Sequence, residues 1–213
     1  DNAGRYNTGS IRGGAMLYAD SLFGHRDRMS LGSYFSGGAQ SPFADYNFPV
    51  NKKDGRVGFT YSSTFAKVKY GAMSDIFDLK SYGTQYSLYY SQPVIRKPGF
   101  ELKTYAAANY KRSRTDIGIK ALPDTAIPSS IDNITSLELA LQARKDTKYG
   151  IWYFNQDAYY SIPIFNSDRD NNYFKYSGSL VRLHDFSHGF IGQLRSNYQI
   201  VPGDKSIPYL DQM

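Results

Sequence analysis

Alternation of apolar and polar side chains is strictest in Ser136-Leu137-Glu138-Leu139-Ala140-Leu141-Gln142-Ala143-Arg144. Successive side chains of a β-strand point to opposite faces, so the three leucines and Ala143 would share one face. Glu138, Gln142 and Arg144 would share the other. This stretch therefore predicts a strand that separates an apolar medium from a wet one. Leucines packed inside a compact water-soluble core, with helices covering the sheet, would contradict that interpretation.

The same period of two recurs along the chain, and helical spacing is almost absent. It predicts about nine strands, with turn-forming residues between them. These strands cover residues 5–20, 28–40, 56–67, 80–91, 100–111, 136–144, 149–162, 173–184 and 189–201. Short connections at 51–55, 96–99, 145–148 and 186–189 alternate with long ones at 68–79, 113–135 and 163–172. Membrane barrels have short periplasmic turns and long outside loops, so the connection 21–27, expected outside, is short for its place.

Composition supports a membrane barrel. The chain holds 20 Tyr and 13 Phe against one Trp, yet its mean hydropathy is −0.51. A barrel wall needs this combination, because one face of each strand meets hydrocarbon and the other meets water. No run of about 18 apolar residues is present, so only a closed barrel could cross a bilayer. We predict an all-β fold, a transmembrane antiparallel up-and-down β-barrel.

Several function classes find little support in the sequence. The absence of cysteine excludes disulfides and thiolate metal sites, and the net charge of +6 is spread without the basic run that nucleic-acid binding would favour. His184 and His188 have metal-ligand spacing but flank a turn, and Asp168 and Asp170 could bind Ca²⁺ but lie in a polar loop. Solvated segments explain both pairs. An outer-membrane enzyme would need a nucleophile and a base on adjacent strands, and no histidine lies inside a predicted strand except at the end of one, so we expect no enzyme. No cofactor is implied.

Five stretches follow one another in an order that is typical of one protein family. They are Asp1-Asn2-Ala3-Gly4 with Thr8-Gly9, Ser21 to Leu31, Tyr46 to Val50, Ser91 to Arg96, and Gln193 to Gln199 with Ile207 to Met213. They resemble, in this order, the opening motif, the first hairpin, an aromatic-x-x-Pro element, a later turn and a final Gln-containing strand with the segment behind it in the two-partner secretion transporters. These form the haemolysin activator and filamentous haemagglutinin transporter family of the outer-membrane assembly barrel superfamily.

This resemblance implies a protein of the bacterial outer membrane, in contact with its lipid, that exports one large partner such as a haemolysin, adhesin or contact-dependent toxin. It also implies a barrel of about sixteen strands. Residues 1–213 would then be an N-terminal portion, without the periplasmic domains and the C-terminal strands. A barrel that assembles other barrels, a passive porin or adhesion barrel, and a complete barrel of about eight or ten strands stay open as alternatives.

Seven polar residues are expected to line the lumen of such a barrel. They could form a hydrated wall along which an extended polypeptide slides, or they could form salt bridges that stiffen the barrel, and alternation alone favours neither. The candidate lining residues are Glu101, Lys103, Glu138, Gln142, Arg144, Gln193 and Arg195. Six aromatic residues are expected in the girdles at the membrane surfaces, namely Tyr61, Tyr86, Tyr90, Tyr110, Trp152 and Tyr198.

Overall fold

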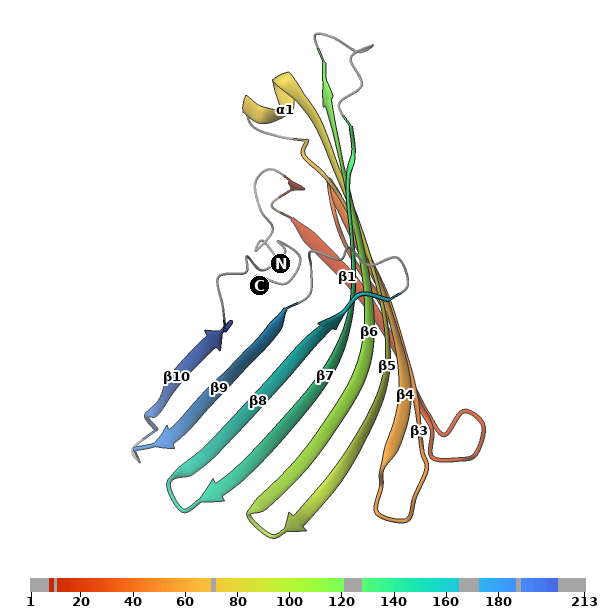
Figure 1. Ribbon diagram of the computed structural model, residues 1–213. Coiled ribbons are helices and arrows are strands. Elements are labelled where there is room, and N and C mark those ends of the chain that lie inside the picture. Colours follow the sequence, from red (N-terminus) through yellow and green to blue (C-terminus); the bar gives the residue numbers. More distant parts are fainter. Residues whose placement is uncertain are drawn as a thin grey trace. The chain divides into compact units, whose positions relative to one another are not determined.

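The structure is a computed structural model that describes residues 8, 9, 11–69, 72–120, 128–164, 173–186 and 189–202. Ten strands and one five-residue helix account for most of these residues (Figure 1). The strands are β1 (Arg12–Asp20), β2 (Arg28–Ser36), β3 (Ala39–Pro49), β4 (Arg56–Lys67), β5 (Phe77–Lys97), β6 (Phe100–Ile119), β7 (Ser130–Thr147), β8 (Gly150–Ile162), β9 (Phe174–Asp185) and β10 (Ile191–Ile200). The helix is α1 (Ala72–Ile76).

The strands are hydrogen-bonded in sequence order, β1 to β10, and the fold is all-β and antiparallel as predicted. In such an order all connections from an odd to an even strand lie at the same ends of the strands. Residues 21–27 join β1 to β2, so they lie at the strand ends that carry the short turns. The expectation that this connection lies among the outside loops is therefore wrong, and its short length is no exception.

Two further differences from the sequence prediction concern the strands themselves. The predicted set omits β3, because Pro42 and Pro49 interrupt the alternation that marks the other strands. The predicted long loop at 113–135 is largely strand, since β6 continues to Ile119 and β7 begins at Ser130. β5, β6 and β7 are consequently long, with 21, 20 and 18 residues.

Two compact units divide the chain. The first comprises Asp1–Phe48, Gly58–Ser87 and Tyr110–Ile134, and the second comprises Pro49–Val57, Leu88–Asn109 and Thr135–Met213. The first unit contains β1, β2, most of β3 and β4, and the helix. The second contains β8, β9, β10 and the parts of β5, β6 and β7 that lie nearest the short turns. All candidate lining residues belong to the second unit.

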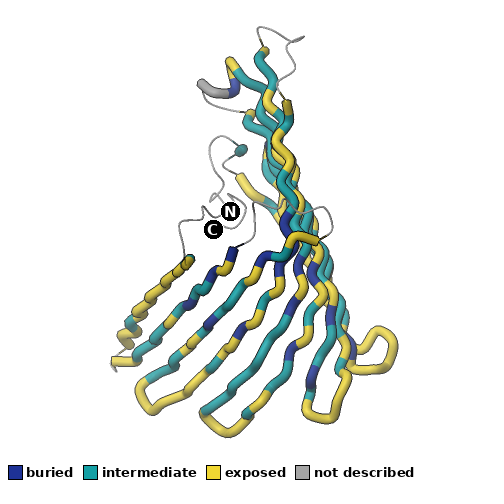
Figure 2. The backbone as a smooth tube through the Cα atoms, viewed as in Figure 1, coloured by how far each residue is buried: buried dark blue, intermediate teal, exposed yellow. Residues whose placement is uncertain are grey.

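Buried positions are scattered along the strands and do not gather in a core (Figure 2). Among the described residues, only Ala107, Ile134, Ala140 and Tyr173 are buried hydrophobic residues. Leu137, Leu139 and Leu141 remain 46%, 65% and 37% exposed, which contradicts the alternative of a compact core with covering helices. No helix in the described part of the chain is long and apolar enough to cross a membrane.

The turn between β1 and β2 is organised by one buried carboxylate. Asp27 accepts hydrogen bonds from the backbone N–H groups of Phe23 and His25, at 3.2 and 3.3 Å. Burial opposes ionisation of Asp27, but these bonds outweigh it and hold the pKa of the carboxyl below its ordinary value. Positive φ angles at Ser21 and Arg26 show how tightly the turn is wound.

Candidate functional site

A polar face of the second unit carries the candidate lining residues. Register places Glu138 opposite Tyr159 and Arg144 opposite Tyr153 across β7 and β8. Tyr153 in turn lies opposite Val181 of β9, and Val181 lies opposite Arg195 of β10. We use "polar face" for the side of the second unit that these residues share. It holds Glu101, Lys103, Glu138, Gln142, Arg144, Tyr153, Asn155, Asp157, Tyr159, Lys175, Gln193 and Arg195.

Glu101 and Lys103 of β6 reach this face beside β7. Together with Gln142, Arg144 and Asn155 they border an open hollow of about 390 Å³. A second hollow of about 390 Å³ lies farther along the sheet, and its lining includes side chains of β8, β9 and β10. All seven residues predicted from the sequence therefore share one side of the sheet, and four of them, Glu101, Lys103, Gln142 and Arg144, border the first hollow.

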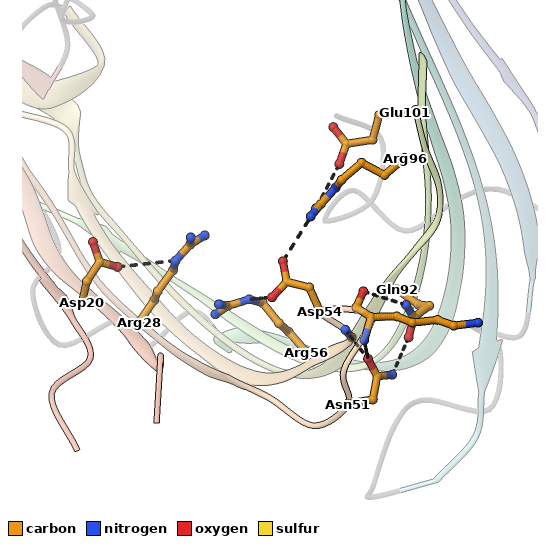
Figure 3. Close-up of polar contacts among 10 residues, drawn as sticks. Asp20, Arg28, Asn51, Asp54, Arg56, Gln92, Arg96 and Glu101 are labelled. Atoms are coloured by element: carbon orange, nitrogen blue, oxygen red, sulfur yellow. Dashed lines mark hydrogen bonds and ion pairs between the residues drawn. The ribbon is translucent and has the colours of Figure 1, made fainter. Parts of the chain in front are cut away.

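Arg96 forms two exposed ion pairs near the short turns. It lies between Asp54 and Glu101, with its Nη2 3.7 Å from Asp54 Oδ2 and 3.4 Å from Glu101 Oε1 (Figure 3). Arg56 Nε also donates to Asp54, at 3.2 Å, but the Arg56 side chain is mostly buried. The Arg96 side chain is 61% exposed. Exposed pairs of this kind contribute about 0–1 kcal/mol each, so they add little rigidity.

Other polar contacts stay within single strands. Arg144 donates to Asp146 at 2.9 Å, and Arg195 donates to Asn197 at 3.2 Å. A bond between residues i and i+2 of one strand cannot hold two strands together. Three of the candidate lining residues have side chains that make no hydrogen bond or ion pair within the described part of the chain, namely Lys103, Gln142 and Gln193. These contacts favour a hydrated surface over a set of stiffening salt bridges.

Glu138 is the exception, because it joins three strands. Its two carboxylate oxygens accept from Asn109 Nδ2 of β6 at 2.9 Å and from Tyr159 Oη of β8 at 3.2 Å. The ammonium of buried Lys175 lies 4.5 Å from the centre of the Tyr159 ring. Sequence reasoning missed Tyr159 and Lys175 as members of this face. The alternation of Asn155 and Asp157 was a usable signal, but aromatic residues on both sides of β8 hid it.

The opposite side of β7 to β10 is an apolar face made of cross-strand rows. Leu137, Tyr160 and Phe174 form a row far from the short turns, and of the residues that β7 pairs with β8 only Thr135 and Ile162 lie farther away on this face. Lys145, Trp152 and Arg182 form a row close to the short turns, with Thr147, Gly150 and His184 between it and the turns. Between these two rows lie three more, which contain Leu139, Leu141 and Ala143. Trp152 thus lies at a boundary of the apolar face, where a girdle residue is expected.

Tyr198 does not lie at such a boundary. It occupies the row of Leu141, Gln156 and Gly178, in the middle of the apolar face. Its hydroxyl and that of Tyr176 both donate to Gln156 Oε1, and Gln156 is buried beneath them. In the first unit, Tyr86 contacts two other predicted girdle residues, Tyr61 and Tyr110, with ring centres 5.3 and 6.4 Å away.

The remaining candidates from the sequence form no site that the structure describes. His184 Nδ1 accepts a hydrogen bond from Arg182 Nη2 at 3.0 Å, which occupies one of the two ring nitrogens a metal could use. His188, Asp168 and Asp170 lie outside the described residues. Within the described ranges, no group of three or more His, Cys, Asp and Glu side chains could hold a metal ion.

Comparison with known proteins places this sheet among outer-membrane barrels. A family model described as haemolysin secretion/activation protein ShlB/FhaC/HecB matches residues 1–210. CdiB from Escherichia coli is similar in structure, with a TM-score of 0.74 and 17% identity over 95% of this chain and 39% of that protein. CdiB from Acinetobacter baumannii gives 0.66 and 16% over 90% and 35%. Among curated sequences, none matches significantly.

BamA from Haemophilus ducreyi, solved without its POTRA domains 1–3, is also similar. Its TM-score is 0.58 and its identity 15%, over 96% of this chain and 43% of that one. These likenesses show the fold, that of an antiparallel β-barrel of the outer membrane. The chain spans 39% and 35% of the length of the two CdiB structures.

Proposed function

The chain belongs to the haemolysin secretion/activation protein family ShlB/FhaC/HecB, a family of outer-membrane β-barrels, and from this membership we propose that it is part of a transporter that secretes one large partner protein. The partner would be a haemolysin, an adhesin or a contact-dependent toxin. It would cross the outer membrane in an extended state. No enzymatic step is part of this proposal.

One observation carries the proposal, namely an exposed polar face of mixed charge behind an apolar one. Glu101, Arg144 and Arg195 have weak, local partners, and Lys103, Gln142 and Gln193 have none within the described residues. An extended chain could exchange hydrogen bonds with such a wall at every step without being held at any one point. We propose that the seven predicted residues line the path of the secreted chain.

The whole barrel is larger than this sheet on the same proposal. Residues 1–213 would be the N-terminal portion of a barrel of about sixteen strands, completed by further strands and preceded by periplasmic domains. Completion is needed physically, because each unpaired backbone group at a strand edge costs several kcal/mol in hydrocarbon. Both β1 and β10 have one described partner strand, so each offers an edge for such pairing.

Deletion of the full gene tests export directly. The cargo should accumulate in the periplasm of the deletion strain, and the gene supplied in trans should restore it to the medium. An assembly barrel would instead lower the amounts of many outer-membrane proteins, and a passive porin would leave both the cargo and these proteins unchanged. Normal secretion of the cargo without the gene would contradict the proposal.

Cysteine substitution tests the lining. The chain contains no cysteine, so single cysteines can be introduced at Gln142 and Arg195 on the polar face and at Leu139 and Leu194 on the apolar face. A charged, membrane-impermeant maleimide should label the first pair in the full-length protein in vesicles and leave the second pair unlabelled. Labelling of Leu139→Cys and Leu194→Cys with protection of the other two would reverse the assignment of the faces.

A further inference from the structure

A cluster of cationic and aromatic side chains lies on the apolar face at its boundary with the short turns. The guanidinium of Arg182 in β9 stacks on the ring of Trp152 in β8, 4.9 Å from its centre. It also donates to Thr147 Oγ1 at 3.1 Å and to the carbonyl of Tyr149 at 3.2 Å. Lys148 Nζ lies 5.4 Å from the centre of the Tyr149 ring.

Charge on this face is confined to that boundary. Lys145 and Arg182 are the only Lys, Arg, Asp or Glu residues on the apolar side of β7, β8, β9 and β10 as described. None of the described residues that share this face of the four strands is an aspartate or a glutamate. The arginine is held by neutral acceptors, and within the described part of the chain it forms no ion pair.

Two cations face lipid here, and no carboxylate of the described residues shares their face. An anion from another molecule would balance their charge. Trp152 separates Lys145 from Arg182 in the cross-strand row. Adjacent strands are about 4.8 Å apart, which puts the two Cα atoms about 10 Å from each other. Long lysine and arginine side chains reach across that distance, and one phosphate between them could accept from both.

Position along the strand indicates where that phosphate lies. The apolar face continues to Thr135, whose partner across the strands is Ile162, ten positions before Lys145. This is a path of about 33 Å at 3.3 Å per residue, or about 25 Å of height at the usual tilt of about 40°. The apolar band of a membrane barrel is also about 25 Å tall, so the row of Lys145, Trp152 and Arg182 lies at the depth of the lipid head groups when Ile162 lies at the other limit of the band.

We propose that this cluster binds the phosphate of an anionic glycerophospholipid in the leaflet on the short-turn side. Arg182 donates to the phosphate while it stays stacked on Trp152, and Lys145 approaches it from the other side of the ring. Tyr149 and Trp152 pack against the glycerol and the upper acyl chains. The short turns of such barrels face the periplasm, so the lipid comes from the periplasmic leaflet and not from the lipopolysaccharide leaflet.

Lipid binding by the full-length protein tests the site. Native mass spectrometry in detergent would follow titration with phosphatidylglycerol, with phosphatidylcholine as the zwitterionic comparison and lipid A as the outer-leaflet comparison. The double variant Lys145→Gln with Arg182→Gln should lose affinity for phosphatidylglycerol by about 30-fold, or about fivefold for each cation removed. Lys103→Gln with Arg195→Gln is the matched control, since it removes the same charge from the polar face.

Two further variants keep the test decisive if Arg182→Gln disturbs folding. The side chain of Lys145 makes no hydrogen bond or ion pair within the described residues, so Lys145→Gln alone should fold normally. Its affinity for phosphatidylglycerol should fall about fivefold. Arg182→Lys keeps the charge but removes the planar guanidinium that stacks on Trp152. Its affinity for phosphatidylglycerol should lie between those of the wild type and Arg182→Gln. Equal losses in the polar-face control, unchanged binding in Lys145→Gln, or a preference for lipid A would each overturn the proposal. Secretion of the cargo is not measured in this experiment. The lipid-binding result would therefore stand even if the proposal of a transporter failed.

Discussion

Gly178 is the residue whose substitution should reveal most about the apolar face. A Cβ atom built at Gly178 would lie 2.4 Å from Gln156 Nε2 and 2.6 Å from both Cζ and Oη of Tyr198. Gly178→Ala must therefore displace the tyrosine ring or the glutamine. Either movement breaks hydroxyl bonds to Gln156 Oε1 and exposes a buried amide to hydrocarbon.

The expected cost follows from these contacts. The three atoms are the far ends of the Gln156 and Tyr198 side chains, which can move aside, so the cost is mainly that of the lost hydroxyl bonds. Each lost hydrogen bond costs about 1 kcal/mol, so Gly178→Ala should lower the free energy of unfolding by about 1–2 kcal/mol. The measurement is urea unfolding of the full-length protein in lipid vesicles, followed by the mobility of folded and unfolded forms on unheated gels. Tyr198→Phe should cost less, and the two changes together should be less than additive because they break the same contact.

Gly83→Ala is the matched control, because it makes the same chemical change in another strand. Its Cβ would meet Thr64 Cβ at 3.8 Å, an ordinary contact, so its effect should stay within about 0.5 kcal/mol. Equal stabilities of Gly178→Ala and Gly83→Ala would refute the reasoning, since the close approach of Tyr198 and Gln156 to Gly178 would then carry no energetic weight.

Three other predictions concern the turn and the polar face. Because the folded pKa of Asp27 is lowered, its stabilisation is present above the unfolded value of about 3.9 and is lost as the pH falls through the folded value. Pepsin cleavage next to Leu22 and Phe23 should thus increase from pH 4 to pH 2 in the wild type, and Asp27→Asn should be cleaved readily throughout; parallel profiles would contradict this. Glu138→Ala removes the hydrogen bonds that the carboxylate accepts from Asn109 and Tyr159 and should cost about 1–3 kcal/mol in urea unfolding, whereas Glu138→Gln, which keeps an acceptor oxygen, should cost less. Arg96→Ala should cost less than about 1 kcal/mol in the same assay because its pairs are exposed, and a larger loss would mean that they hold the turns together.

The sequence predicts the faces of this sheet better than its contacts. A period of two assigns Leu139 and Arg144 to opposite sides without knowledge of any neighbour, because the side-chain direction is local. It does not say which residues meet across strands. Trp152 and Arg182 are thirty positions apart in the chain, and only the register of β8 and β9 places one beside the other.

Local rules also failed where two signals disagreed. Pro42 and Pro49 hid β3, although proline is tolerated in strands at positions that need no N–H donor. Charged residues made 113–119 resemble a loop, yet the β-branched residues Thr115, Ile117 and Ile119 continue β6. The seven candidate lining residues were predicted without Tyr159 and Lys175, whose place on the polar face depends on the pairing of β7, β8 and β9.

The length of β5 and β6 affects what meets the barrel from outside the cell. About ten residues suffice for a strand to cross the bilayer, whereas these two have 21 and 20, so in the proposed orientation roughly half of each strand extends beyond the hydrocarbon at the end opposite the short turns. A protease binds its substrate as an unpaired extended chain, and backbone that is hydrogen-bonded to a neighbouring strand cannot bind in that way. Proteases added outside the cell should therefore leave these paired segments uncut.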